Sequence, residues 1–374
     1  MKKLILLLFL GICTSTFSQD LKREIDAIAK AYSAVGVAYV VVKEGKIIHS
    51  DAIGYKDLEK HVKLDPANDL FRIASISKSF TATALMQLVS DKKLSLDTDF
   101  GTLVGYPVRN PKFPEKVITL RMVLSHTSSI NDRNGYFNLD AINPQKNPEW
   151  YKGYNDYEPG TSYQYCNLNF NMAGAALERT VGVRFDTYIK RRILEPLGLE
   201  GGYCVDSLDQ KALVPLYVYD STAVGFVPQP AAYAPRSEEI KNYVMGYSTP
   251  VFSPTGGMKI SAEDLARYMI MHMNYGYSDG TKIIDRKAAK IMQTPVNEEA
   301  GYGLALRVRK DFVNNRALVG HTGSAYGLYS AMFFDPKERF GIVVITNGCR
   351  PKYQDDEPTI LKEIANYLYD HLVK

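Results

Sequence analysis

The chain has 374 residues, of which 45% are hydrophobic and 23% are charged, and this is the composition of an ordinary globular protein. The length exceeds what one average hydrophobic core requires, so one large domain or two closely packed domains are expected. The 45 lysines and arginines nearly balance the 41 aspartates and glutamates, so the charge gives no reason to expect nucleic acid or another polyanion as a partner.

The first 18 residues have the features of an export signal. A basic start at Lys2 and Lys3 precedes an apolar run over residues 4–13 and a small-x-small cleavage site that ends at Ser18. The run is too short for a transmembrane helix, and we expect no transmembrane segment elsewhere. Cys13 suggests a lipoprotein, but the bulky residue before it disfavours lipidation. We therefore expect simple cleavage and a periplasmic or secreted protein.

Three cysteines remain after cleavage, namely Cys166, Cys204 and Cys349. The number is odd, so at least one thiol is free, and no Cys-x-x-Cys or Cys/His spacing indicates a metal site. Buried structural cysteines are the simplest interpretation, and a Cys204–Cys349 disulfide stays open. We expect no metal and no other cofactor.

The first hundred residues of the mature chain predict elements of both types. Apolar residues from Leu21 to Tyr32 recur at helical spacing, which indicates an amphipathic helix. Residues 36–42 and 46–53 flank a turn with a glycine, which predicts a β-hairpin. From Phe80 to Val89 nearly every residue is apolar or a good helix former, so this helix should be buried.

The middle of the chain, from about residue 101 to 248, is rich in Pro, Gly, Asn and Tyr, with short helical apolar runs. We expect a loop-rich, mainly helical lobe there and strands only later. The β-rich segments are residues 301–308, 317–321, 326–334 and 340–346. A capped helix should begin at Ser261, and a closing helix at about Pro358.

Strands at both ends with helices between them predict an α+β fold. One antiparallel sheet would be flanked by the N- and C-terminal helices, with the helical lobe inserted. After the signal at 1–18 we expect one domain over 19–374, with the sheet part at about 19–100 and 249–374 and the lobe at about 101–248. A cleft between lobe and sheet is the natural place for a functional site.

Ser75 and Lys78 stand three residues apart at the start of the buried helix, so their side chains share one face. A hydroxyl at a helix N-terminus with an amine within reach is the arrangement of an activated nucleophile. The spacing alone is common, because Ser90 and Lys93 repeat it where the helix gives way to a polar segment. That second copy indicates a solvated helix end.

Tyr165 and Asn167 are two residues apart, so in an extended loop their side chains point the same way. A phenol beside an amine can share its proton, and a carboxamide can bind a substrate amide or orient the lysine. Packing is the alternative for each residue alone, since the chain has 26 tyrosines.

The segment from His321 through Thr322 and Gly323 to Ser324 lies between two predicted strands. Its small residues allow a close approach between backbone and ligand, and the N–H just past Gly323 can supply half of an oxyanion hole. The alternative is a Gly-rich strand turn with a packed histidine.

Taken in order, Ser-x-x-Lys at Ser75, Tyr-x-Asn at Tyr165 and His-Thr-Gly at His321 resemble the serine β-lactamase and penicillin-binding superfamily. The spacing is similar to the class C β-lactamase branch, with its D-alanyl-D-alanine carboxypeptidases, D-aminopeptidases and esterases. The resemblance covers about residues 30–370. Further matching stretches are Leu124–Ser128, Pro159–Thr161, Pro196–Gly198, Gly256–Met258 and Tyr302–Leu304.

The resemblance implies a serine hydrolase that forms an acyl-enzyme on Ser75. Lys78, neutral or sharing its proton with Tyr165, would take the hydroxyl proton. Tyr165 would then protonate the leaving group and activate the deacylating water. The N–H groups of Ser75 and Ser324 would hold the oxyanion, and Asn167 would orient the substrate amide.

The third motif departs from the pattern of many β-lactamases and penicillin-binding proteins, which have lysine at the position of His321. A histidine with a pKa near 6.5 is mostly neutral at pH 7. With Thr322, Gly323 and Ser324 it would line the substrate site without a fixed cation. We therefore expect weak recognition of carboxylates and poor β-lactam hydrolysis, in favour of an amide, peptide or ester.

Other functions stay open. A D-Ala-D-Ala carboxypeptidase or a β-lactamase proper would use the same residues, as would acyl transfer to an amine or alcohol. A non-catalytic covalent sensor of the penicillin type is disfavoured by Tyr165, which belongs to the deacylation machinery. The expected partner is a small-molecule or peptide-like substrate, with cell-wall fragments among the candidates, and the oligomeric state is left open.

Overall fold

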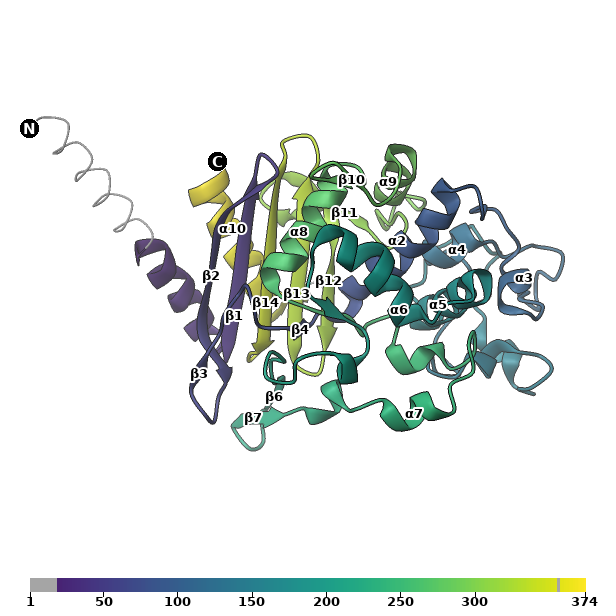
Figure 1. The fold of residues 1–374 in the computed structure, drawn as a ribbon, viewed down its shortest axis with the longest axis horizontal. Coiled ribbons are helices and arrows are strands. Elements are labelled where there is room, and N and C mark those ends of the chain that lie inside the picture. Colours follow the sequence, from purple (N-terminus) through teal and green to yellow (C-terminus); the bar gives the residue numbers. More distant parts are fainter. Residues whose placement is uncertain (1–18, 355–356) are drawn as a thin grey trace, which may run out of the picture.

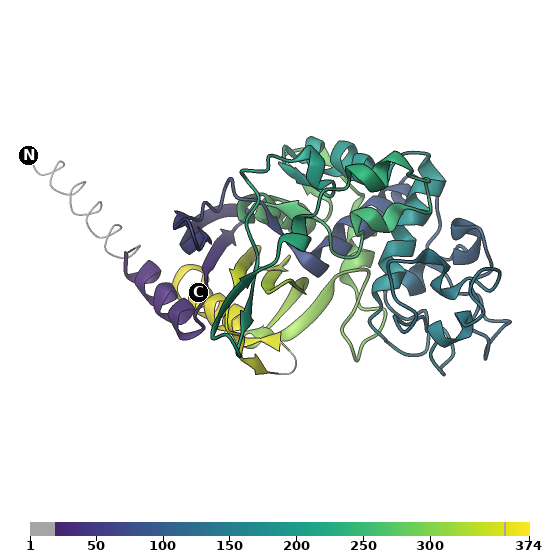
Figure 2. The same ribbon diagram turned by 90° about the horizontal axis from the view of Figure 1, so that it is seen from below.

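The computed structural model describes residues 19–354 and 357–374, so the expected export signal at 1–18 lies outside the described residues. A β-sheet with its helices forms one end of the molecule, and a body of short helices and loops forms the other (Figure 1). The described termini both lie at the sheet end, and the blue and teal lobe lies away from them (Figure 2).

A seven-stranded antiparallel sheet joins the two ends of the chain, as predicted. Its strand order is β11-β12-β13-β14-β1-β2-β3. The N-terminal strands are β1 (Gly36–Lys43), β2 (Lys46–Asp57) and β3 (Val62–Lys63). The C-terminal strands are β11 (Arg307–Val313), β12 (Arg316–Ala325), β13 (Leu328–Asp335) and β14 (Phe340–Gly348). Strand β1 pairs with β14 in the middle, so the sheet forms only when both ends of the chain meet.

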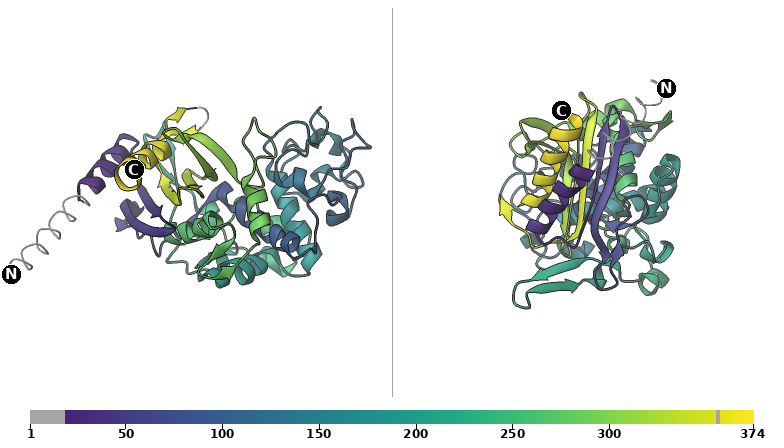
Figure 3. Two further views of the ribbon diagram at one scale, coloured as in Figure 1. Left: turned by 90° about the horizontal axis from the view of Figure 1, so that it is seen from above. Right: turned by 90° about the vertical axis from the view of Figure 1, so that its left-hand side faces the viewer.

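Helices cover both faces of this sheet. Along β1, Val37, Tyr39 and Val41 face one apolar cluster while the residues between them face the other, as the two-residue period of a strand requires. The helix over residues 19–31 and α10 (Thr359–Leu368) pack side by side on the first face (Figure 3). Helix α8 (Ala262–Met273) covers the second face, and Ser261 caps it as expected.

Helix α2 (Ser77–Ser90) is the predicted buried helix and runs from the sheet into the lobe. Residues 77–88 are all buried, which agrees with the prediction of a buried helix that is apolar nearly all round. It packs against α5 (Asn167–Val181), α6 (Phe185–Ile189) and α9 (Arg286–Gln293). A small sheet of β4 (Phe71–Arg72), β8 (Lys259–Ile260) and β5 (Gly201–Gly202) lies at its N-terminal end.

The middle lobe is mainly helical and loop-rich, but the expectation that strands return only after it was wrong. The short helices are α3 (Phe100–Val104), α4 (Leu120–Leu124) and α7 (Ser237–Lys241). The lobe also holds β5 and a hairpin of β6 (Tyr217–Asp220) and β7 (Gly225–Pro228). Each strand of that hairpin has only four residues, and the turn between them also has four. Strands this short carry too few apolar residues to be predicted from the sequence.

The strand predicted at 301–308 was also misplaced, because β11 begins only at Arg307. Residues before it turn instead: Gly301 and Ala305 have left-handed φ angles of 64° and 57°. At Gly303 an added Cβ would lie 2.3 Å from the carbonyl oxygen of Met292. Strand β11 is the edge of the sheet, where polar residues are tolerated and the apolar signal is weak.

The remaining strands are short two-stranded pairs. They are β9 (Tyr277–Ser278) with β10 (Thr281–Lys282), and β15 (Tyr353–Gln354) with β16 (Glu357–Pro358).

Among the described residues, none of the helices has the length and apolar character needed to span a membrane.

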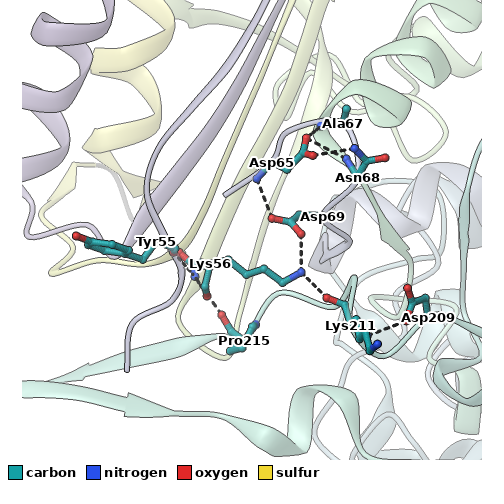
Figure 4. A network of polar contacts seen from close by, with 10 residues as sticks. Tyr55, Lys56, Asp65, Ala67, Asn68, Asp69, Asp209, Lys211 and Pro215 are labelled. Atoms are coloured by element: carbon teal, nitrogen blue, oxygen red, sulfur yellow. Dashed lines mark hydrogen bonds and ion pairs between the residues drawn. The ribbon is translucent and has the colours of Figure 1, made fainter. Parts of the chain in front are cut away.

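A polar network holds the segment that leads into α2 (Figure 4). The ammonium of Lys56, on β2, donates to Asp69 Oδ1 and to the carbonyl oxygen of Lys211, each at 2.5 Å. Asp69 Oδ2 accepts the backbone N–H of Asp65 at 2.8 Å. The Lys56–Asp69 pair is largely buried, so it joins the sheet, the lobe and the approach to the helix at one point.

The cysteines agree with the simplest interpretation. Cys166, Cys204 and Cys349 are free and buried, so the possible Cys204–Cys349 disulfide is absent. Within the described part of the chain, no group of histidine, cysteine and acidic residues is arranged to hold a metal ion.

Candidate active site

Ser75 lies in a single 3-10 turn, η1 (Ala74–Ile76), directly before α2. Ala74 has a left-handed φ of 49°, which is unfavourable for a residue with a side chain and typical of strained turns at functional sites. The turn leaves Ser75 half-buried. Lys78, in the first turn of α2, is fully buried. Their Oγ and Nζ atoms are 3.1 Å apart, as the spacing predicted.

Lys78 Nζ has two further partners, Asn167 Oδ1 at 3.0 Å and the carbonyl oxygen of Thr255 at 2.9 Å. Burial lowers the pKa of Lys78 to about 7, against the opposing effect of the Asp132 carboxylate. A neutral amine has two hydrogens and one lone pair. Since two carbonyl oxygens can only accept, they take both hydrogens, and the lone pair is left for the hydroxyl of Ser75.

The ring of Tyr165 lies beside the same nitrogen, Nζ of Lys78. Lys78 Nζ is 4.7 Å from the centroid of its ring. Burial raises the pKa of Tyr165, and its hydrogen bond with Ser75 acts in the opposite direction. The phenol therefore keeps its proton at neutral pH, and of the two groups beside Ser75 only the amine is free to accept a proton.

Asn167 is held in one orientation from both sides. Its Oδ1 accepts from Lys78 and from Thr255 Oγ1 (2.9 Å), while its Nδ2 donates to Asp132 Oδ2 at 2.9 Å. The same carboxylate accepts the backbone N–H groups of Asn167 and Leu168, each at 2.9 Å. An anion at the start of α5 is stabilised by the helix N-terminus, so Asp132 fixes both the helix and its first side chain.

Several residues that hold this site were not found in the sequence. Asp132 is 35 residues from Asn167 and Thr255 is 177 residues from Lys78, so no local pattern marks either. Ser330 on β13 is a third, because its hydroxyl donates at 3.0 Å to the carbonyl oxygen of Ile73, just before the nucleophile turn.

The segment from His321 to Ser324 lies on β12, against the nucleophile turn. An added Cβ at Gly323 would lie 2.3 Å from the carbonyl oxygen of Ile73 and 3.1 Å from the backbone nitrogen of Ser75. Only glycine allows this approach of the two backbones. The third motif therefore packs directly against the backbone that carries Ser75.

His321 is buried and neutral. Its Nδ1 is 2.5 Å from the carbonyl oxygen of Thr322, and its Nε2 is 2.9 Å from Tyr302 Oη. A carbonyl can only accept, so Nδ1 carries the hydrogen and Nε2 accepts from the tyrosine hydroxyl. Burial, followed by the charge of Lys78, lowers the pKa of His321 to about 3. The side chain therefore supplies no cation at neutral pH.

All eight predicted site residues meet at one place. Six of them, Ser75, Tyr165, His321, Thr322, Gly323 and Ser324, line a cavity of about 230 Å³. Lys78 and Asn167 lie behind Ser75 and bond to each other. The cavity wall also includes Arg307, which is half-buried and whose Nε donates to the carbonyl oxygen of Ala300 at 2.8 Å.

A buried amine against a serine hydroxyl, with a phenol over both, is the arrangement of a serine hydrolase that uses lysine as its base. A family model described as Beta-lactamase matches residues 21–366. The chain belongs to the beta-lactamase family of serine hydrolases.

Individual relatives are distant. Protein flp of Staphylococcus aureus (strain MRSA252) is 24% identical over 336 residues, which is 83% of this chain and 59% of that protein. A D-aminopeptidase of Cereibacter sphaeroides is 24% identical over 342 residues, 87% of this chain and 59% of that protein. The chain thus spans 59% of the length of these curated relatives.

Among solved structures, the octameric penicillin-binding protein homologue from Pyrococcus abyssi superimposes with a TM-score of 0.73 and 25% identity, covering 94% of this chain and 77% of that one. This likeness agrees with the predicted α+β fold of the β-lactamase and transpeptidase type.

Proposed function

We propose that the protein is an exported hydrolase that cleaves an amide, peptide or ester bond through an acyl-enzyme on Ser75. The observation that carries this proposal is the 3.1 Å contact of Ser75 Oγ with the buried amine of Lys78, whose other two partners can only accept hydrogens. The D-aminopeptidase relative, by its name, acts on amino-terminal peptide bonds and supports the amide class.

The reaction follows from these contacts. Neutral Lys78 takes the hydroxyl proton while Ser75 Oγ bonds to the substrate carbonyl carbon. The backbone N–H groups of Ser75 and Ser324 stabilise the oxyanion, and one such donor is worth on the order of 10²–10³ in rate. Tyr165 passes a proton to the leaving nitrogen or oxygen as its bond to the carbonyl carbon breaks, and Lys78 restores that proton. Water then hydrolyses the acyl-enzyme by the same groups in reverse.

Asn167 contributes mainly through Lys78. Its Oδ1 accepts hydrogen bonds from Lys78 and Thr255, and one hydrogen of its Nδ2 is donated to Asp132. A single amide hydrogen is left to bind a substrate acyl group. Of the two roles considered for this side chain, orienting the lysine has the stronger support.

The neutral state of His321 supports weak β-lactam hydrolysis, because a penicillin or cephalosporin carries a carboxylate that a fixed cation would bind. A second candidate has one observation in its favour. Arg307 lines the cavity, on β11 opposite Gly320, the residue before His321. This cation favours substrates with a carboxylate near the scissile bond, as in a D-Ala-D-Ala carboxypeptidase.

A substrate panel tests the main proposal. Purified protein is assayed with p-nitrophenyl esters, D-amino acid amides and peptides, and nitrocefin, always beside Ser75→Ala. We expect Ser75-dependent turnover of esters or amides and slow turnover of nitrocefin. Efficient nitrocefin hydrolysis would contradict the weak β-lactamase activity, and a panel without Ser75-dependent turnover would contradict the hydrolase.

Two further measurements separate the alternatives. Intact-mass spectrometry after a fluorophosphonate and after nitrocefin should show an adduct of the first and no lasting adduct of the second. A stable stoichiometric nitrocefin adduct would indicate a sensor instead. With Arg307→Gln, a rise in KM for carboxylate-bearing peptides, without a change for their amidated forms, would establish the second candidate.

A further inference from the structure

His126 is fully buried and contacts the backbone on both sides of the tyrosine proposed to donate the proton. Its carbonyl oxygen accepts the N–H of Gln164 at 2.9 Å, and its ring Nδ1 accepts the N–H of Cys166 at 3.1 Å. The residue between these two donors is Tyr165, whose ring centroid is 4.4 Å from that of His126. One side chain and its own backbone thus determine where Tyr165 lies.

The protonation state of His126 follows from the same contact. Since Nδ1 accepts an N–H, the ring hydrogen must be on Nε2. Nε2 is buried and has no hydrogen-bond partner among the described residues. The His126 ring lies beside the rings of Phe170 and Tyr302, with centroid-to-centroid distances of 5.2 Å and 5.0 Å. Burial, then the charge of Lys78, holds the pKa of His126 well below its usual value.

Two features of His126 are unfavourable for the fold. Its backbone φ is 59°, a left-handed value that is strained for a side chain of this size. A buried N–H without a partner also weakens the folded state. The fold tolerates this strained backbone and this unpaired N–H at the one residue whose Nδ1 accepts the N–H of Cys166 and whose ring lies against the ring of Tyr165.

We propose that His126 is a positioning residue for proton donation by Tyr165. It holds residues 164–166 so that the phenol hydroxyl reaches the leaving group above Ser75. The inference rests on the proposed function, because it concerns a step of that same reaction.

The leaving group distinguishes this role from a general structural one. An amine or an alkoxide leaves only with a proton, whereas p-nitrophenolate is weakly basic and leaves as the anion. Misplacing Tyr165 should therefore slow the acylation step with amides and alkyl esters far more than with p-nitrophenyl esters. Loss of Ser75 or of the whole site would slow all substrates alike.

Three substitutions separate the acceptor from the ring. His126→Asn places an oxygen where Nδ1 lies and tolerates the left-handed backbone. His126→Gln carries the same amide one carbon further out, and His126→Phe keeps a ring without an acceptor. We expect the Gln and Phe variants to lose about 10²-fold in acylation by an amide and only a few-fold with a p-nitrophenyl ester. The Asn variant should lose less than 10-fold with either.

Tyr165→Phe serves as the reference and should show the same amide-selective loss. His272→Phe is the matched control. His272 is a fully buried histidine on α8 whose pKa burial lowers to about 3, and its Nε2 is 3.4 Å from Thr83 Oγ1, outside the cavity. It should leave the amide-to-ester ratio unchanged even if it lowers the melting temperature.

Single-turnover rates for one amide and one p-nitrophenyl ester give the ratio for each variant. An equal loss on both substrates in His126→Phe, or identical behaviour of the Asn and Gln variants, would overturn the inference. If His126→Phe does not fold, the Asn and Gln pair decides. A wild-type protein that neither turns over the substrates nor reacts with a fluorophosphonate would contradict the proposed function instead.

Discussion

The two ends of helix α2 carry the same Ser-x-x-Lys spacing in opposite environments. At the N-terminal end Lys78 is fully buried and bonded to Ser75. At the C-terminal end the side chain of Lys93 is 67% exposed, and its Nζ is 3.8 Å from Asp91. Ser90 there accepts the backbone N–H of Asp285 at 3.2 Å. Ser75 thus bonds to an amine, whereas Ser90 bonds to the backbone of the residue that caps α9.

The difference is one of desolvation, not of space. A cavity of about 730 Å³ lies at Ser90 and Lys93, larger than the 230 Å³ at Ser75. The exposed side chain of Lys93 stays hydrated, whereas two carbonyl oxygens and a hydroxyl replace water around Lys78. The larger cavity is therefore not the candidate active site. The buried amine of Lys78 distinguishes the candidate site from the second copy of the motif.

Removing the two hydroxyls should give the largest contrast. Ser75→Ala removes the nucleophile, and we expect a loss of at least about 10³-fold in kcat/KM. Ser90→Ala should keep full activity, because Ser90 touches no group of the proposed mechanism. The measurement is turnover of a p-nitrophenyl ester by both variants at equal concentration. Equal losses in the two would show that the active hydroxyl is misassigned.

The two lysines should differ next. Arginine keeps the donors of Lys78 but never loses its proton, so Lys78→Arg should lower acylation by about 10²–10⁴-fold, the usual contribution of a general base. Lys93→Arg should change nothing. Pre-steady-state acylation rates measure this directly, and near-normal acylation by Lys78→Arg would exclude the lysine as the base.

The pH profile should sharpen the comparison further. Below pH 7 Lys78 carries its proton and has no lone pair, so kcat/KM should fall about 10-fold per pH unit below about 7 and level off above it. Asp132→Asn removes the carboxylate that opposes this shift, so the midpoint should move to lower pH. The variant should also lose about 10-fold in rate, because Asn167 is less firmly held. A midpoint that stays in place would mean that Asp132 acts only through geometry.

Much of the fold could be predicted, because its signals are local. The hairpin at 36–53, the buried helix after Ser79 and the closing helix from Pro358 all follow from the periodicity of apolar residues. The misplaced β11 and the missed hairpin of β6 and β7 have the opposite property. They are short or polar, and they become strands only through the partners that the fold brings to them.

The site divides in the same way. Ser75, Tyr165 and His321 could be proposed from spacing and resemblance, because each lies in a short motif. The residues that orient them could not. Asp132 and His126 act on a segment that starts more than 30 residues later. The low pKa of His321 comes from its burial and from the charge of Lys78, and both arise only in the folded chain.

The smallest expected effect concerns stability at the second serine. Ser90 Oγ is the acceptor for the N–H of Asp285, and Asp285 in turn caps α9 by accepting the N–H of Ala288 at 2.7 Å. Ser90→Ala leaves that first N–H to water, so unfolding free energy should fall by about 0.5–1.5 kcal/mol while kcat/KM stays unchanged. Urea unfolding of the variant beside the wild type measures this. A change in kcat/KM without a change in stability would give the second Ser-x-x-Lys copy a functional role that its exposed lysine does not support.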